Sequence, residues 1–408
     1  MSSGDPPSVS AIVVNWNGRH LLDDCLRSIA ALAYPRERVE ILVFDNGSRD
    51  GSVEWLSGAW PAARVLRSES NLGFALACNR AAAASSANIL AFLNNDLRVE
   101  PSWLGRMVEA LRATAAAAAG SRILDWEGRC YDFDGAAMNF YGHGTSRRHG
   151  RRTDGAVAGA PVDTLFACGA AMVAERARFL ASGGFDADYF AYFEDVDLGW
   201  RLWLEGERVV HVPGAIAYHR HHGSGLPGEQ RTRLLEQNAL ATIVKNYEDV
   251  NLQRILPAAL LLLEARARLA SGERAAPYRD TLATFHDGLP ALQAKRAAVQ
   301  ARRRRPDREI VPLFAAPFRP SFFGRAYWRE QERVVRAFGI APLFGAEGAM
   351  ATSQGMDDFV GELQGRIEEL EAELAAARQT AAAAEAEHRA EQERLGAEIA
   401  RLRSELHA

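Results

Sequence analysis

The sequence lacks any long uninterrupted apolar run. No stretch of about 18 apolar residues occurs in its 408 residues, so we expect no membrane-spanning helix. The first ten residues, MSSGDPPSVS, contain no basic segment followed by an apolar one, so we expect no secretory signal. These two absences predict a cytoplasmic protein.

Cysteine is scarce, and neither sign of charge predominates. The four cysteines, Cys25, Cys78, Cys130 and Cys168, lie far apart and form no CxxC pair. This spacing favours buried thiols in a reducing compartment over a disulfide framework. Lys and Arg number 48 and Asp and Glu number 52, which gives a formal charge of −4. Such a balance argues against a protein whose whole surface meets nucleic acid.

No Gly-rich phosphate-binding loop follows the first predicted strand, and two other familiar motifs are absent. The segment VVNWNGRH after the first predicted strand is not GxGxxG, and neither GxxxxGK[ST] nor GxSxG occurs. The chain is therefore not expected to be a Rossmann dehydrogenase, a P-loop enzyme or a serine hydrolase of the nucleophile-elbow type.

Composition divides the chain into three parts. Residues 8–228 are rich in strand-like runs, turns and glycine, residues 229–345 read as mostly helical, and residues 356–407 are almost entirely Ala, Glu, Arg, Leu and Gln. In the last part, apolar residues recur in steps of three and four, which predicts a coiled coil. Such a coiled coil would join two copies of the chain or recruit a partner helix, and a solitary charged helix is the alternative.

The first part alternates apolar strands with helices. Strands are predicted at 9–15, 39–44, 64–66 and 89–93, and helices at 21–32, 73–84 and 101–118. This order predicts an α/β domain with a mostly parallel sheet and helices on both faces. Ligands of such sheets bind at the carboxyl ends of the strands. Polar clusters follow three of these strands: Asn15 with Asn17, Asp45 with Asn46, and Asn94 with Asn95 and Asp96.

Each cluster has a structural explanation beside a functional one. Asp45 is either a turn or capping residue, or an acceptor for the imide N–H of a uracil or thymine ring. The Asn94–Asp96 segment is either an Asx turn or a site for Mg²⁺ or Mn²⁺. Such cations take few protein carboxylates together with phosphate oxygens.

Two further clusters lie towards the end of the first part. Glu194 and Asp195 open a helical, largely apolar segment, where the helix dipole favours anions. They are either a plain acidic helix start or a catalytic carboxylate at the mouth of a pocket. His219, His221 and His222 follow the apolar run 209–217, and His219 is a candidate metal ligand.

Taken together, these segments resemble the family 2 inverting glycosyltransferases of the GT-A fold, and most of all their bacterial rhamnosyltransferase-like branch. The resemblance covers residues 8–225 and rests on seven segments in the family's order. They are VSAIVVNWNG, VFDNGSRDGS, NLGFALACNRA, LAFLNNDL, DTLFACGAAMVAER with GGFD, YFAYFEDVDLGWRLWLEG and VPGAIAYHRHHGS. It implies a Rossmann-like GT-A domain that transfers a sugar from a nucleoside diphosphate sugar. The acceptor would be a hydroxyl of a glycan or lipid-linked molecule in cell-surface polysaccharide synthesis, and the branch suggests dTDP-rhamnose as donor.

The resemblance also implies roles for single residues. Asp195 would be the general base, with Glu194 beside it, and Asp45 would bind the base of the nucleotide. Asp96 would end the family's DxD motif and hold Mg²⁺ or Mn²⁺, with His219 as second ligand and His222 as its alternate. The nucleotide-sugar pocket would further be lined by Asn15, Asn17, Asn46, Asn71, Gly73, Asn79, Asn94 and Asn95. Asn94 stands where the motif has its first Asp, which leaves Asp96 as the main ligand.

The rival interpretations differ in chemistry. A single inverting displacement needs one base and one cation, whereas a glycoside hydrolase needs two carboxyls flanking the bond. A nucleotidyltransferase is expected to carry a basic, Gly-rich loop after the first strand, which VVNWNGRH lacks. A non-catalytic coiled-coil scaffold of a glycan assembly complex is the other rival.

One basic segment fits none of these motifs. Lys295, Arg296 and the run Arg302–Arg305 lie close together in the middle part. They form either a solvated helical face or a peripheral surface for anionic lipid at the inner face of the cell membrane.

Overall fold

The computed structural model describes residues 5–153, 155, 159–220, 226–322 and 324–345. Four strands open the fold: β1 (Val9–Asn15), β2 (Val39–Asp45), β3 (Arg64–Arg67) and β4 (Ile89–Asn94). Three helices connect them: α1 (Arg19–Ala30), α2 (Ser52–Ala59) and α3 (Phe74–Ala84). β1 and β4 are nearly continuous apolar runs, buried as central strands of parallel sheets are. The four strands and the helices α1 and α3 lie within two residues of their predicted ends.

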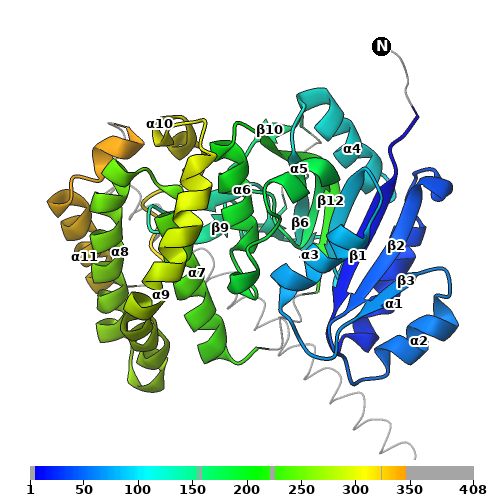
Figure 1. The fold of residues 1–408 in the computed structure, drawn as a ribbon, viewed down its shortest axis with the longest axis horizontal. Helices are drawn as coiled ribbons and strands as arrows, with labels where there is room; N and C mark the ends of the chain where they lie inside the picture. The colour runs from blue at the N-terminus through cyan, green and yellow to red at the C-terminus, as the bar shows by residue number, and fades with distance from the viewer. Residues whose placement is uncertain (1–4, 154, 156–158, 221–225, 323, 346–408) are drawn as a thin grey trace, which may run out of the picture. The chain divides into compact units, whose positions relative to one another are not determined.

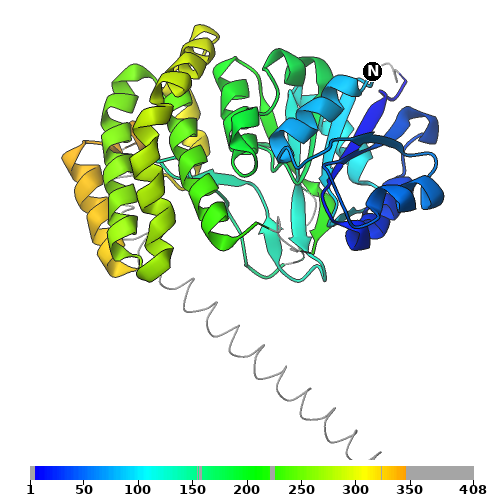
Figure 2. The same cartoon turned by 60° about the horizontal axis from the view of Figure 1, so that its bottom comes forward.

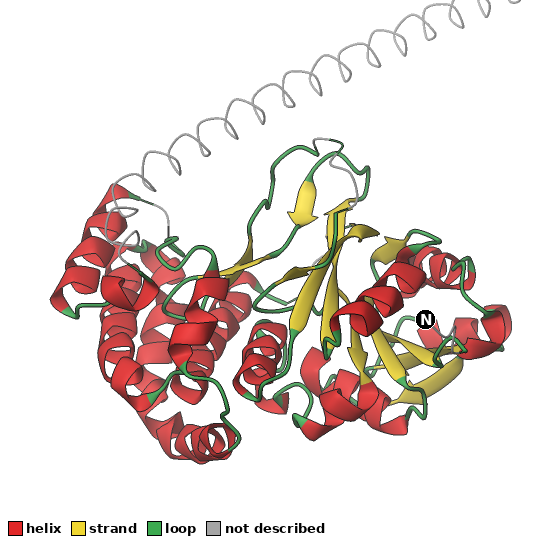
Figure 3. Ribbon diagram, turned by 90° about the horizontal axis from the view of Figure 1, so that it is seen from above, coloured by secondary structure: helices red, strands yellow, loops and turns green. Residues whose placement is uncertain are grey.

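The strands form one sheet in the order β10-β12-β6-β11-β4-β1-β2-β3, in which β10 (Val162–Asp163) is an edge strand. β3, β2, β1 and β4 are mutually parallel. β11 (Ala171–Glu175) is antiparallel to β4 and to β6 (Ala118–Asp125), whereas β12 (Val209–His219) runs parallel to β6. Helices lie on both faces of the sheet (Figure 3). The α/β class with a parallel-rich sheet is confirmed, and β11 makes the sheet mixed.

The prediction of a helix over 101–118 is wrong at its C-terminal end. Helix α4 covers only Trp103–Thr114, and Ala115 takes a left-handed conformation with φ 53°. Ala118 already belongs to β6. The alanine-rich run has a high helix propensity, but pairing with β11 and β12 in the sheet interior overrides it.

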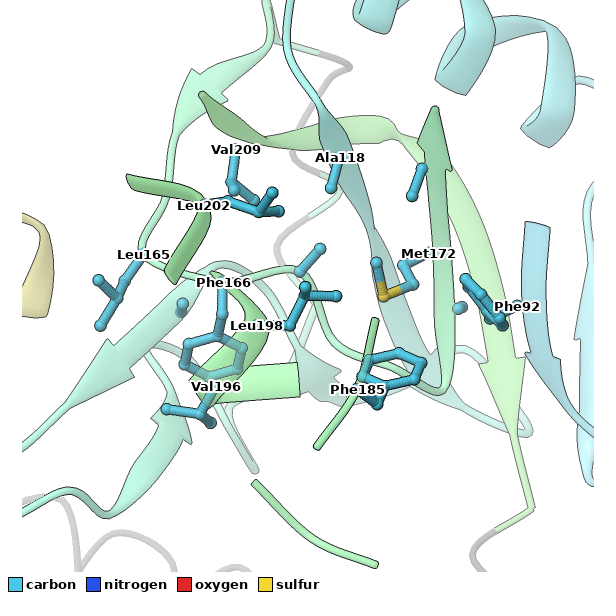
Figure 4. Packing of buried hydrophobic residues seen from close by; sticks show 14 of the residues in the cluster. Phe92, Ala118, Leu165, Phe166, Met172, Phe185, Val196, Leu198, Leu202 and Val209 are labelled. Atoms are coloured by element: carbon cyan, nitrogen blue, oxygen red, sulfur yellow. The ribbon is translucent and has the colours of Figure 1, made fainter. Parts of the chain in front are cut away.

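Helix α6 (Glu194–Leu204) lies almost entirely inside the protein. Figure 4 shows Val196, Leu198 and Leu202 packed in the same apolar cluster as Phe166. Burial of side chains of this size stabilises the helix by roughly 1.5–3 kcal/mol each. The acidic residues at its start are therefore carried on a rigid element.

Residues 229–345 are helical, as predicted. The elements are α7 (Gly228–Asn246), α8 (Asp249–Leu269), α9 (Ala276–Ala301), α10 (Asp307–Ile310) and α11 (Arg325–Ala337). Helices α7, α8 and α9 pack side by side (Figure 1; Figure 2). The described residues between 5 and 345 belong to one compact unit, so these helices pack as part of the same body as the sheet.

The basic segment at the end of α9 is bound to the protein itself. Its ion pairs are Lys295 with Asp186 and Asp188, Arg302 with Glu205, and Arg303 with Asp307. The guanidinium of Arg305 lies 5.0 Å from the centre of the Trp203 ring. These contacts attach the end of α9 to the sheet-bearing part of the fold, while Arg302 and Arg304 remain exposed to solvent.

The predicted coiled coil at 356–407 lies outside the described residues. Within the described part of the chain, no helix is both long and apolar enough to cross a bilayer.

Candidate functional site

The carboxyl ends of β1, β2 and β4 meet at one edge of the sheet, as the sequence predicts. Asn15 is the register partner of Asp45, and its neighbour Val14 is the partner of Asn94. Asp45 is fully buried, and its carboxylate accepts a hydrogen bond from the backbone N–H of Ser48 at 3.2 Å. Three of the predicted site residues are thus brought together by parallel pairing alone.

The asparagine side chains nearest this edge bond to the protein itself. Asn15 donates to Ser52 Oγ at 3.0 Å and accepts from Asn95 Nδ2 at 2.8 Å. Asn17 accepts from the backbone N–H of Arg49 at 2.8 Å. These bonds tie the strand ends and the following loops into one rigid edge.

The remaining predicted asparagines hold two further loops. Asn46 donates to Asn71 Oδ1 at 2.9 Å and to the carbonyl of Gly73 at 3.1 Å. Asn79 brackets Phe185, donating to its carbonyl at 2.7 Å and accepting from its N–H at 3.0 Å. A side chain that makes such bonds fixes the shape of the loop it contacts.

Trp16 is a residue that the sequence reasoning missed. It follows β1 directly and remains 36% exposed, whereas Asn15 beside it is fully buried. Its flat ring is available at the same edge of the sheet for stacking on a planar ligand. The signal in the sequence is a large aromatic placed between two asparagines at a strand end.

Asp96 and His219 meet at the same side of the sheet. β5 (Leu97–Val99) follows Asp96 directly and pairs with β12, so that His219 lies opposite Leu97. This register brings His219 Nε2 to 3.1 Å from Asp96 Oδ2. On the other side of the ring, His219 Nδ1 lies 2.7 Å from Asp132 Oδ2. The sequence predicted the first pair and missed Asp132, which lies on β7 (Tyr131–Phe133) outside any motif.

Two carboxylates change the titration of this imidazole. Burial acts to lower the pKa of His219, but the hydrogen bonds to Asp132 and Asp96 outweigh it and raise the pKa to about 9. A positive charge is therefore favoured between these acids. A divalent cation would supply positive charge at the same place, because imidazole and carboxylate are both ligands of Mn²⁺.

Asp96 and His219 fit two of the ligand positions of a cation whose other ligands come from outside these side chains. Neighbouring ligands of an octahedral ion are about 3 Å apart, and the Asp96 and His219 donor atoms are separated by 3.1 Å. Among the described residues no group of three or more His, Cys, Asp or Glu side chains is arranged to hold a metal. Phosphate oxygens and water would have to supply the other ligands, which is how Mg²⁺ commonly binds. The alternate ligand, His222, lies outside the described residues.

Asp195 is fixed by backbone N–H groups at the start of α6. Its Oδ2 accepts from the N–H of Gly169 at 2.8 Å, and its Oδ1 accepts from the N–H of Val196 at 2.8 Å. Glu194 is buried, and its Oε2 has no hydrogen-bond partner among the described residues. The two neighbouring carboxyls therefore occupy different environments.

These environments separate the two acids chemically. Burial raises the pKa of Glu194 well above its usual value, and the nearby Asp195 charge raises it further. Burial also raises the pKa of Asp195, while the Gly169 and Val196 N–H groups oppose that rise. Two carboxyl groups whose environments move their pKa values apart in this way can serve as an acid and a base. Asp195 is the one that ionises more readily and is less buried.

A short segment links the Asp195 site to the end of β4. Gly169 donates its N–H to Asp195 at 2.8 Å, and the carbonyl of the next residue, Ala170, accepts from the N–H of Asn94 at 2.9 Å. Asn94 precedes the Asn95-Asp96 pair directly. The Asp195 carboxylate and the candidate metal ligand that follows β4 are thus connected through two neighbouring residues of one segment.

The chain is similar in sequence to several known glycosyltransferases. The model of the family described as glycosyl transferase family 2 matches residues 10–157. An N-acetylglucosaminyl-diphospho-decaprenol L-rhamnosyltransferase of Mycobacterium tuberculosis is 31% identical over 228 residues, which make up 49% of this chain and 73% of the relative. Glycosyltransferase AglE of Haloferax volcanii is 32% identical over 120 residues, or 29% of this chain and 40% of that protein.

The fold has counterparts among solved structures. The crystal structure of GalNAc-T7 with UDP, GalNAc and Mn²⁺ superposes with a TM-score of 0.53 at 16% sequence identity. The match covers 71% of this chain and 57% of that chain. At this level of identity the likeness concerns the arrangement of helices and strands alone.

Proposed function

The chain belongs to glycosyl transferase family 2, and from that premise we propose that it transfers a sugar from a nucleoside diphosphate sugar to an acceptor hydroxyl, with inversion at the anomeric carbon. One observation carries the proposal. The segment Gly169-Ala170 holds Asp195 through the N–H of Gly169 and the end of β4 through the carbonyl of Ala170. It connects a candidate base with a candidate site for the leaving diphosphate, the two parts that a single displacement needs.

Asp195 is the proposed base. Its carboxylate takes the proton of the acceptor hydroxyl as that oxygen attacks the anomeric carbon and the bond to the diphosphate breaks. The N–H groups of Gly169 and Val196 fix the orientation of the carboxylate. Glu194, which burial favours in its neutral form, adds no second negative charge next to the base.

Asp96 and His219 are the proposed protein ligands of Mg²⁺ or Mn²⁺. When bound, such a cation supplies the positive charge that stabilises a leaving diphosphate. Asp132 holds the His219 ring from its Nδ1 side, so that Nε2 faces Asp96. Metal dependence is thus proposed from this donor set.

The donor site is proposed at the ends of β1 and β2. Asp45 would accept the N–H of a pyrimidine base, and the exposed ring of Trp16 would stack on that base. Asn15, Asn46, Asn71 and Asn79 would shape the pocket through the loops they hold. The rhamnosyltransferase named among the relatives supports dTDP-rhamnose as the donor to test first, and a lipid-linked glycan as acceptor.

Two proposed associations concern the surroundings of the enzyme. A lipid-linked acceptor would place the protein at the inner face of the cell membrane, and residues 356–407 would join two copies or recruit a partner. Cosedimentation with anionic vesicles at low and high salt, together with light scattering at tens of micromolar, tests both proposals.

Calorimetric titration tests the donor assignment. UDP-, dTDP- and GDP-sugars are titrated with Mn²⁺ into the native chain and into Asp96→Ala. We expect one nucleotide to bind selectively, and to lose its metal-dependent binding in the variant. Asp163→Ala, which removes an exposed carboxylate on β10 (Val162–Asp163), is the matched control. Absence of binding by all three donors would overturn the proposal in favour of a non-catalytic scaffold.

A further inference from the structure

The segment that leads into Asp195 has an unusual backbone. Phe190, Tyr192 and Phe193 have positive φ angles of 60°, 72° and 64°. A bulky L-residue in such a conformation is strained, and it persists only when the surrounding structure holds it. The chain enters α6 directly from Phe193. The position of Asp195 therefore depends on contacts that keep residues 189–193 in this shape.

One side chain outside the sheet-bearing part makes several of these contacts. Asn238 on α7 is buried, and its Nδ2 lies 3.0, 2.9 and 2.7 Å from the carbonyl oxygens of Tyr189, Ala191 and Tyr192. An amide nitrogen has two hydrogens, so the three carbonyls share them. Losing this donor would remove the side-chain hydrogen bonds that α7 gives to these three carbonyls.

The opposite side of the segment is held by the start of α3. The N–H of Ala75 donates to the carbonyl of Phe190 at 3.2 Å. Gly73 approaches so closely that an added Cβ would lie 2.5 Å from the same carbonyl oxygen. Residues 189–193 are thus clamped between α3, which adjoins the proposed donor site, and α7.

Asn238 is one of three polar contacts from the same face of α7. Thr242 Oγ1 lies 2.9 Å from the hydroxyl of Tyr189, and Lys245 Nζ lies 2.7 Å from Asp186. Positions 238, 242 and 245 recur at i, i+4 and i+7, which places them along one helix face. The family model matches residues 10–157, so α7 contributes these contacts from beyond the matched region.

We infer that Asn238 is a positioning residue for the proposed base: it holds the strained segment 189–193 in the conformation that aims Asp195 at the acceptor. The inference rests on the proposed function for its kinetic part and on the structure alone for its conformational part. If Asn238 were purely stabilising, its substitution would lower the free energy of unfolding without selectively affecting turnover.

Asn238→Leu and the milder Asn238→Ser test the inference in the full chain. Gln331→Leu is the control. Gln331 lies on α11 and is also a buried amide, and it donates to the backbone carbonyl of Phe318. Hydrogen exchange of residues 186–196 reports the conformation. Thermal unfolding, nucleotide-sugar affinity and kcat are measured on the same samples.

For both Asn238 variants we expect faster exchange in residues 186–196 and a kcat lowered by about 10²-fold, the scale expected for a base displaced by about 1 Å. Donor affinity should stay within about twofold. The Gln331 variant should lose thermal stability with little change in kcat or in exchange of this segment.

Unchanged exchange in both Asn238 variants would overturn the inference. So would a loss of kcat no larger than that of the control at equal stability. If the native chain transfers no sugar, the proposed function fails, and the exchange data still decide whether Asn238 holds the segment.

Discussion

His219 Nε2 lies 3.1 Å from Asp96 Oδ2, although the two residues belong to distant parts of the sequence. The antiparallel pairing of β12 with β5 produces this proximity, because it sets His219 opposite Leu97. The N–H of Arg220 also donates to the carbonyl of Asp96 at 3.1 Å. The geometry of the proposed metal site is therefore fixed by sheet register rather than by a flexible loop.

His219→Ala should weaken Mn²⁺ binding by more than about tenfold, because it removes one of the two proposed protein ligands. The free Mn²⁺ signal in electron paramagnetic resonance, with metal alone as the probe, measures this affinity. His286→Ala, which removes an exposed histidine on α9, is the control. Equal Mn²⁺ affinity in the native chain and in His219→Ala would remove this residue from the site.

Asp132→Ala should weaken Mn²⁺ binding by about 10- to 100-fold, the range observed when a partner that orients a metal-ligating histidine is lost. The physical reason is the 2.7 Å contact between Asp132 Oδ2 and His219 Nδ1. Nucleotide affinity measured without metal should stay the same. A variant with unaltered metal affinity would show that the ring keeps its orientation without Asp132.

Stability should depend on pH through Glu236, which accepts from Arg266 at 2.6 Å and lies 3.2 Å from His143. Burial acts to raise the pKa of Glu236, but the Arg266 and His143 charges outweigh it and lower the pKa to about 2 from 4.5. A depressed pKa contributes stability above about pH 4.5, and that contribution is lost as the pH falls towards 2. Its size is about 3 kcal/mol.

Urea unfolding of native chain and Glu236→Gln between pH 7 and 3 measures this contribution. The native chain should lose stability across the acid range more steeply than the variant. Glu229→Gln, at the exposed start of the same helix, should follow the native curve. If the stability of the native chain and of Glu236→Gln fell equally with decreasing pH, the assigned role of Glu236 would be contradicted.

Strands and strand ends could be predicted from the sequence, because apolar β-branched runs and the polar residues after them are local features. The prediction placed Asp45 and Asn94 at the same edge of the sheet, and the register confirms it. The end of α4 could not be predicted, because an alanine-rich run has a helical propensity that only its sheet partners override.

The parts of the site that could not be predicted depend on long-range packing. Asp132 and Asn238 stand in no motif, and only the folded chain brings them to His219 and to residues 189–193. The asparagines show the reverse case. Asn46 and Asn79 stand in recognisable segments, but their amides bond to neighbouring loops, a distinction that residue type does not reveal.

The proposed role of Asp195 as the base is the central claim, and Asp195→Asn tests it most directly. The substitution keeps the size of the side chain and removes the carboxylate that would accept the acceptor proton. With the donor identified by calorimetry, kcat for sugar transfer and the affinity for that donor are measured on the native chain and on the variant. The account predicts a loss of kcat of about 10²- to 10⁴-fold with donor affinity retained; near-native turnover in Asp195→Asn would contradict it.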